Sequence, residues 1–333
     1  MKATEDNKQT KDTVKKGVMT MPFVSTVDGV AYRDLNKNGR MDPYEDSRLP
    51  IEERVADLLS QMTLEEKAGL MFHTIAGVNP DGTLEPAPGP FRNMVLTSAL
   101  TEQHLNHFNV HALPETPRAV EWHNRLQALA ESTRLGIPVT ISSDPRHAFS
   151  DNPLTSFMSG ALSQWPEPIG LAATGDAELV EQFGDIARQE YLALGIRVAL
   201  HPMADLATEP RWARINGTFG ENAELSARLT AAYIRGFQGE TLGAKSVACM
   251  TKHFPGGGPQ KDGEDPHFPY GREQVYPGDN FDYHLIPFDA AFAAGSAQIM
   301  PYYGMPIGTQ YEEVGFGFNQ GVITDLLRKH YGF

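Results

Sequence analysis

The stretch CMTKHFPGGG, residues 249–258, decides how the fold of this chain is interpreted. The apolar run Val247–Met250 predicts a buried strand, and Lys252 and His253 stand at its end, before a Phe-Pro pair and a run of glycines. A lysine beside a histidine at the carboxyl end of a strand offers two hydrogen-bond donors to a polar ligand. In barrels of alternating strands and helices, active sites lie at that end. The alternative is a surface Lys-His pair before a turn.

The rest of the chain alternates between helical and extended patterns. We expect strands at residues 137–141, 196–200, 247–250 and 297–300, and helices at 119–135, 176–194, 222–238, 281–294 and 321–330. Residues 70–72 are a candidate first strand, and residues 77–117 have the composition of loops with short helices. Alternating helices and strands with short connections predict a parallel sheet.

Polar residues follow the ends of the expected strands, namely Asp144, Asp205, Lys252, His253 and Tyr303. Such a ring favours a TIM-type (β/α)8 barrel over an open sheet, because barrel active sites lie at the carboxyl ends of the strands. An open doubly wound sheet usually carries a glycine-rich phosphate fingerprint after its first strand, and the sequence lacks that motif there.

The composition restricts the class of protein. A chain of 333 residues is long enough for one large α/β domain or two smaller ones. Its net charge of −14 argues against nucleic acid as a partner, since phosphate binding needs a basic face. The single cysteine, Cys249, excludes an internal disulfide and cysteine-rich metal sites, and we expect it to be a buried structural thiol.

The sequence indicates no membrane partner, because no apolar run approaches the ~20 residues of a membrane helix. The polar residues 1–17 lack the apolar segment of a signal peptide, and we expect them to be disordered. The expected location is therefore the cytoplasm, or outside it with a signal already removed.

A calcium-type loop is the sharpest local motif. Residues 34–45 match the pattern D-x-[DN]-x-[DN]-G-x5-E at every specified position. The expected oxygen ligands come from Asp34, Asn36, Asn38, Arg40 through its backbone carbonyl, Asp42 and Glu45. The expected role of the ion is structural, and the alternative is an Asn/Asp/Gly turn without metal.

Several motifs together resemble the N-terminal barrel of glycoside hydrolase family 3. They are KHFPGGG at 252–258, EPRWAR at 209–214, TFGEN at 218–222 and MTLEEK at 62–67. The resemblance covers residues 49–333 and leaves residues 1–48 as an N-terminal extension that carries the calcium-type loop. It implies a retaining β-glycosidase that removes terminal sugars from non-reducing ends, foremost a β-glucosidase and secondly a β-xylosidase.

The resemblance also assigns a sugar pocket to Asp144, Arg214, Lys252, His253 and Tyr303. Independently, a pyranose offers vicinal hydroxyls, which a carboxylate accepts from and which Lys, Arg and His donate to. We expect these side chains to converge on one pyranose. We also expect Lys252, as a strand-end lysine, to contribute little to the core.

Two departures from the family pattern and two structural alternatives bear on this pocket. A Pro-Arg-His-Ala run at 145–148 stands where the family usually has His-Gly, and Ala213 replaces a glycine. Arg214 has the alternative role of an ion pair with a nearby glutamate, Glu209 or Glu221. Asp205 has the alternative role of fixing a loop or pairing with Arg211.

The family nucleophile is an aspartate on the strand that follows a Leu-Leu-Arg helix and a Gly-Phe pair. Here LLR occupies 326–328 and the Gly-Phe pair ends at Phe333. A retaining glycosidase needs two carboxyl groups about 5 Å apart. We therefore expect no catalytic residue of the family type within this chain, an incomplete barrel, and completion by residues beyond Phe333 or by a partner chain.

Two other functions stay open. Some family members, the β-N-acetylglucosaminidases, use a histidine paired with an aspartate as acid/base, and Asp265-Pro266-His267 resembles that dyad. Gly257 replaces a histidine expected in those enzymes. The other alternative is a non-catalytic carbohydrate-binding module, consistent with the missing nucleophile.

Overall fold

The computed structural model of the chain describes residues 24–27, 29–85, 95–148 and 162–333. Residues 1–17, for which we expect disorder, lie outside these ranges. The chain divides into two compact units, Met1–Met62 and Thr63–Phe333. Each unit is built around its own local structure.

The first unit contains a small hairpin, a polar loop and a helix. Strand β1 (Val24–Val27) pairs antiparallel with β2 (Val30–Arg33). The loop that follows closes on a short 3-10 turn at Pro43–Glu45. Helix α1 (Ile51–Gln61) begins directly after Pro50, whose fixed φ suits the start of a helix.

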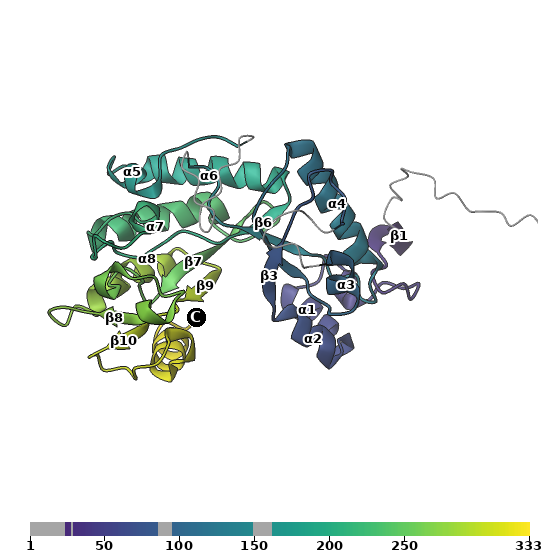
Figure 1. The fold of residues 1–333 in the computed structure, drawn as a ribbon. Coiled ribbons are helices and arrows are strands. Elements are labelled where there is room, and N and C mark those ends of the chain that lie inside the picture. Colours follow the sequence, from purple (N-terminus) through teal and green to yellow (C-terminus); the bar gives the residue numbers. More distant parts are fainter. Residues whose placement is uncertain (1–23, 28, 86–94, 149–161) are drawn as a thin grey trace, which may run out of the picture. The chain divides into compact units, whose positions relative to one another are not determined.

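The second unit is organised around a parallel sheet (Figure 1). Its strands are β3 (His73–Ala76), β4 (His107–Val110), β5 (Thr140–Ser143), β6 (Ile196–Ala199), β7 (Ala248–Phe254) and β9 (Gln298–Pro301). They lie side by side in the order β3-β4-β5-β6-β7-β9, which follows the chain apart from β8. Sequential parallel order is typical of a (β/α)8-type barrel, whereas a doubly wound sheet reverses its order at a switch point. The predicted TIM-type α/β fold is confirmed.

Helices connect these strands, as the alternating pattern predicts. They are α2 (Leu64–Leu70), α3 (Leu96–Thr101), α4 (Thr116–Ser132), α5 (Pro168–Ala172), α6 (Ala177–Ala193), α7 (Ala223–Gln238), α8 (Ile286–Ala293) and a π-helical segment at Gly321–His330. Asp176 and Asn222 cap α6 and α7 by accepting from backbone N–H groups of the first turn. A separate parallel pair joins β8 (Glu273–Val275) to β10 (Met305–Ile307).

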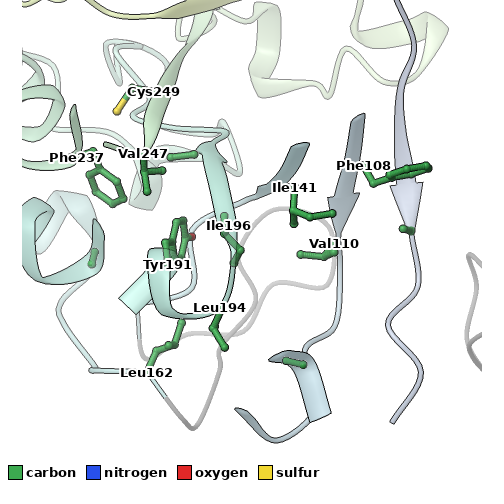
Figure 2. Packing of buried hydrophobic residues seen from close by; sticks show 14 of the residues in the cluster. Phe108, Val110, Ile141, Leu162, Tyr191, Leu194, Ile196, Phe237, Val247 and Cys249 are labelled. Carbon is green, nitrogen blue, oxygen red and sulfur yellow. The ribbon is translucent and has the colours of Figure 1, made fainter. Parts of the chain in front are cut away.

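The main core lies between the sheet and the helices α4, α6 and α7. Tyr191 of α6 and Phe237 of α7 pack edge to face, 5.9 Å between ring centroids, close to the buried Val247 (Figure 2). Helices α6 and α7 approach closely through Gly184 and Gly236, where a Cβ on Gly236 would lie 2.8 Å from Gly184 Cα. This packing fixes β6 and β7 and therefore the loops at their carboxyl ends.

Two sequence expectations about strands are wrong. The segment 70–72 is not the first strand, because the capping box of Thr63 and Glu66 starts a helix that runs through Leu70, and β3 begins only at His73. Strand β4 lies inside the segment 77–117 that was assigned to loops and short helices.

Candidate functional site

The carboxyl ends of β5, β6 and β7 bring chemistry-bearing side chains together. Asp144 directly follows β5, and Lys252 lies near the end of β7. The backbone of Lys252 bonds to the segment after β6, accepting from Ala204 N at 2.7 Å and donating to Pro202 O at 3.0 Å. Register between these strand ends is thus fixed by the backbone, before any side chain is considered.

Asp144 and Lys252 form a buried ion pair. Lys252 Nζ lies 2.8 Å from Asp144 Oδ1, with the side chains 4% and 11% exposed respectively. Asn109 of β4 donates from Nδ2 to Asp144 Oδ2 at 3.2 Å. Burial acts to raise the pKa of Asp144, but the charge and hydrogen bond of Lys252 outweigh burial and keep the pKa below its ordinary value. The carboxylate is therefore ionised and a strong acceptor.

The expectation that Lys252 contributes little to the core is wrong. Its ammonium group is buried and lies against a carboxylate contributed by another strand end. Removing one member of such a pair leaves the other charge buried without compensation. Lys252 therefore matters for stability as well as for any ligand.

Arg214 and His253 form the second half of the cluster. Arg214 Nη1 lies 3.1 Å from His253 Nε2, and Arg214 Nη2 lies 3.6 Å from Met203 Sδ. The ion pair of Arg214 with Glu209 is not formed, because Glu209 binds Arg211 at 2.8 Å. The guanidinium is thus held beside the imidazole.

Asp205 fixes a loop, as one of its alternatives stated, and does not pair with Arg211. Its Oδ2 lies 2.8 Å from His253 Nδ1, and its Oδ1 accepts from the backbone N–H groups of His253, at 3.1 Å, and Gly257. Arg211 instead contacts Glu209 and Asp262.

Tyr303 stands apart from the other predicted pocket residues. Its side chain is exposed, and its ring contacts that of His267, 5.0 Å between centroids. The neighbouring Tyr302 is buried, and its ring lies 4.8 Å from that of His253 and 6.2 Å from that of Tyr303. The structure thus clusters Asp144, Arg214, Lys252 and His253, whereas Tyr303 lies outside this cluster and is linked to it through Tyr302.

A pocket opens beside this cluster. Its lining includes Arg214, Lys252, Met203, Phe219 and His201. A cationic rim beside the ionised Asp144 offers both donors and an acceptor, which is the combination that a polyhydroxylated ligand needs.

The Asp265–His267 dyad is formed. His267 Nδ1 lies 2.6 Å from Asp265 Oδ1, and the two side chains are 48% and 42% exposed respectively. The Arg214 charge acts on Asp265, which places the dyad's loop near the cluster. A side chain at Gly257 is sterically excluded here, since a Cβ would lie 2.9 Å from the Tyr302 ring and 3.0 Å from Asp205 Oδ1.

Sequence reasoning missed Asn109 and Tyr302. Asn109 belongs to β4, which was assigned to a loop, so its place at a strand end was hidden. Tyr302 directly follows β9 and is buried, whereas the next residue, Tyr303, is exposed. Choosing between these adjacent tyrosines requires knowledge of their burial, which the sequence does not show.

The loop at residues 34–45, in the first unit, folds its polar side chains onto one another. Asn36 Nδ2 and Asn38 Nδ2 each lie 2.5 Å from Asp42 Oδ2. Asp34 accepts from the backbone N–H of Asn38 at 3.0 Å. The amide groups of Asn36 and Asn38 therefore converge on the carboxylate of Asp42.

The remainder of the same loop is tightly turned. Gly39 has a φ of 79°, and a Cβ there would meet nothing within 4 Å, so backbone conformation rather than space favours glycine. Glu45 accepts from Leu35 N at 2.6 Å and from Asp42 N at 2.9 Å. Within the described ranges, no group of three or more His, Cys, Asp or Glu residues is arranged to hold a metal ion.

Among the described residues, every helix is too short or too polar to span a bilayer. Taken together, the barrel-type sheet and the polar cluster at its carboxyl edge define the class as a β/α-barrel protein with a polar site at the ends of its strands. The chain belongs to glycosyl hydrolase family 3, since the model of that family's N-terminal domain matches residues 90–333.

Curated relatives include proteins named beta-glucosidase. Beta-glucosidase C of Emericella nidulans is 52% identical over 302 residues, covering 90% of this chain and 48% of the relative. The probable beta-glucosidase C of Aspergillus oryzae is 49% identical over 322 residues, covering 96% of this chain and 49% of the relative. The chain spans about half the length of the curated relatives it matches.

A solved structure is similar in fold. The glycoside hydrolase family 3 β-N-acetylglucosaminidase from Paenibacillus superposes with a TM-score of 0.67 at 28% identity, covering 82% of this chain and 48% of that chain. This similarity supports the barrel-type fold.

Proposed function

We propose that this chain is the sugar-binding part of a retaining β-glucosidase, with β-xylosides as secondary substrates. The observation that carries the proposal is the cluster of Asp144, Lys252, Arg214 and His253 at the carboxyl edge of the sheet. Curated β-glucosidases about half identical to this chain support the choice of sugar.

In this proposal the cluster holds the terminal sugar through its hydroxyls. The ionised Asp144 accepts hydrogen bonds from hydroxyls, while Lys252 and Arg214 donate to neighbouring oxygens. Tyr303 is exposed beside the dyad, so it would contact the sugar from the solvent side of the pocket. Hydroxyl contacts that strengthen as the sugar ring flattens contribute to transition-state binding.

The two carboxyl groups of a retaining mechanism complete the site. We infer that the nucleophile is supplied by residues that follow Phe333 or by a partner chain, as the family pattern implies. The role of this chain would then be to bind and orient the sugar so that its anomeric carbon meets that nucleophile.

A second candidate function is that of a β-N-acetylglucosaminidase in which His267 moves the proton. The contact between His267 and Asp265 favours it, because a carboxylate orients an imidazole for proton transfer. The absence of a side chain at Gly257 counts against it, since the equivalent histidine of those enzymes has no space here.

Hydrolysis of a panel of 4-nitrophenyl glycosides by the complete protein tests the proposal. We expect the highest kcat/KM on the β-glucoside, a lower value on the β-xyloside, and a large loss in Asp144→Asn. Asp262→Asn, on an exposed loop, is the matched control. A preference for the β-N-acetylglucosaminide that disappears in His267→Ala would establish the second candidate, and sugar binding without turnover would indicate a non-catalytic module.

We further propose that the loop at residues 34–45 binds one structural calcium ion. Asn36, Asn38 and Asp42 already meet within hydrogen-bond distance, and rotating the two amides would turn their oxygens toward the same point. Asp34, Glu45 and the carbonyl of Arg40 would complete an all-oxygen shell, which is what calcium prefers.

Thermal unfolding with and without calcium tests the calcium proposal. Because an ion that binds only the folded state stabilises it, Tm should rise when calcium is added after chelation. Magnesium is the control ion, and Glu45→Gln is the control variant that should abolish the rise. An unchanged Tm in the parent protein would contradict the proposal.

A further inference from the structure

Asp205 is a completely buried carboxylate whose role in the candidate site is not explained by contact with a ligand. Its side chain is 0% exposed and that of its partner His253 is 4% exposed. One oxygen faces the imidazole Nδ1 at 2.8 Å, and the other accepts from two backbone N–H groups, of His253 and Gly257. Both oxygens of Asp205 are therefore used in holding His253 and its loop.

Arg214 fixes the state of the other imidazole nitrogen. A guanidinium only donates hydrogen bonds, so His253 Nε2, 3.1 Å from Arg214 Nη1, must be the acceptor. The proton of the neutral ring is then on Nδ1, where it faces the carboxylate. Burial, aided by the Arg214 charge and opposed by Asp205, lowers the pKa of His253 to about 4, so the ring is neutral near pH 7.

We propose that Asp205 is a positioning residue that fixes His253 as its Nδ1–H tautomer, so that Nε2 serves the sugar pocket as a hydrogen-bond acceptor. For the identity of the ligand this inference rests on the proposed function. When the sugar binds, one of its hydroxyls takes the place of Arg214 as the donor to Nε2, and Arg214, like Lys252, then donates to sugar oxygens. His253 was expected from the sequence to donate, and the contacts reverse that direction.

The geometry makes Asp205→Asn the informative substitution. The asparagine keeps the size of the side chain and, with its oxygen in the Oδ1 position, still accepts from the backbone N–H groups of His253 and Gly257. Its NH2 group then meets His253 Nδ1, which must give up its proton to accept. The proton moves to Nε2, where it faces the donor of Arg214. Turning the amide over would place its NH2 group against the two backbone N–H donors, so two donors would still face each other.

Nitrogen NMR of the imidazole reads the tautomer directly, because protonated and unprotonated ring nitrogens resonate far apart. The unmutated chain, labelled with 15N-histidine, should show Nδ1 protonated and Nε2 unprotonated for His253 near pH 7. The resonance is assigned by its loss in His253→Gln. In Asp205→Asn the two nitrogens should exchange states, whereas Asp262→Asn should leave them unchanged.

Kinetics of the complete protein give the second readout. Asp205→Asn should lower kcat/KM for an aryl β-glucoside about 10- to 100-fold, because a buried donor is left facing a donor. Asp262→Asn should leave kcat/KM unchanged. Far-UV circular dichroism and Tm of each variant show whether it folds.

The outcomes separate this inference from the proposed function. A proton on Nε2 of His253 in the unmutated protein overturns the inference, and this measurement does not depend on Asp205→Asn folding. A folded Asp205→Asn with the parent tautomer or the parent kcat/KM also overturns it. A protein with the predicted tautomer that hydrolyses no β-glucoside would overturn the proposed function while supporting the role of Asp205 in fixing the tautomer.

Discussion

The buried ion pair of Lys252 and Asp144 predicts a large stability loss when the lysine alone is removed. Lys252→Met keeps most of the side-chain volume but leaves the carboxylate without its 2.8 Å partner. Breaking a buried pair in this way costs about 3–5 kcal/mol. The remaining hydrogen bond from Asn109, at 3.2 Å, and the nearby Arg214 charge reduce the loss, so we expect about 3 kcal/mol.

A double-mutant cycle separates the pair from other effects of the substitution. Asp144→Asn removes the stranded charge, so Lys252→Met/Asp144→Asn should be more stable than the sum of the single losses indicates. We expect a coupling free energy of at least about 1.5 kcal/mol. The assay is urea unfolding at pH 7, followed by circular dichroism, with Lys329→Met on the exposed surface as the control for loss of a lysine.

Two results would refute this reasoning. A loss below about 1 kcal/mol in Lys252→Met would mean that water or local movement compensates Asp144, so that the pair is not buried as described. Additive single losses would mean that the two side chains do not interact across their 2.8 Å separation.

Two further predictions concern pH and packing around His253. The pKa of His253 is lowered from 6.5 in the unfolded chain to about 4 in the folded state, so the unfolded state binds the proton first. The neutral His253 ring therefore contributes about 3 kcal/mol to the free energy of unfolding above pH 6.5, and this contribution is lost as the pH falls toward 4. Urea unfolding across that pH range measures the loss. A free energy of unfolding that does not change over the range would contradict the prediction. Gly257→Ala places a Cβ 2.9 Å from Tyr302 and should cost about 1–3 kcal/mol, whereas Gly243→Ala, with nothing within 4 Å, should change stability by less than about 0.5 kcal/mol. Equal changes in Tm for the two alanine variants would contradict this prediction, because they would show that the residues around Gly257 rearrange to accept the Cβ.

Much of the fold was predictable because hydrophobic periodicity and capping are local signals. The expected strand at 196–200 and helix at 222–238 correspond closely to β6 and α7. Strand β4 was not predictable in the same way, because its short run His107–Val110 lies in a segment rich in loop-forming residues and gains its burial only from its neighbours.

The same difference between local and long-range signals applies to the candidate site. Lys252 and His253 were found because a strand end is visible in the sequence. Asp144 and Asp205 were also found at strand ends, but their pairing with Lys252 and His253 was not predicted, since Asp144 lies 108 positions from Lys252 and Asp205 lies 48 positions from His253. Burial and ionisation follow from such long-range contacts, which is why the stabilising role of Lys252 and the tautomer of His253 required the structure.

A crystal structure of the complete protein with glucose bound tests the central claim most directly. The account predicts one pyranose at the carboxyl edge of the sheet, with its hydroxyls within hydrogen-bond distance of Asp144, Lys252, Arg214 and His253 Nε2. Glucose bound elsewhere in the molecule, with the Asp144–Lys252 pair untouched, would contradict it.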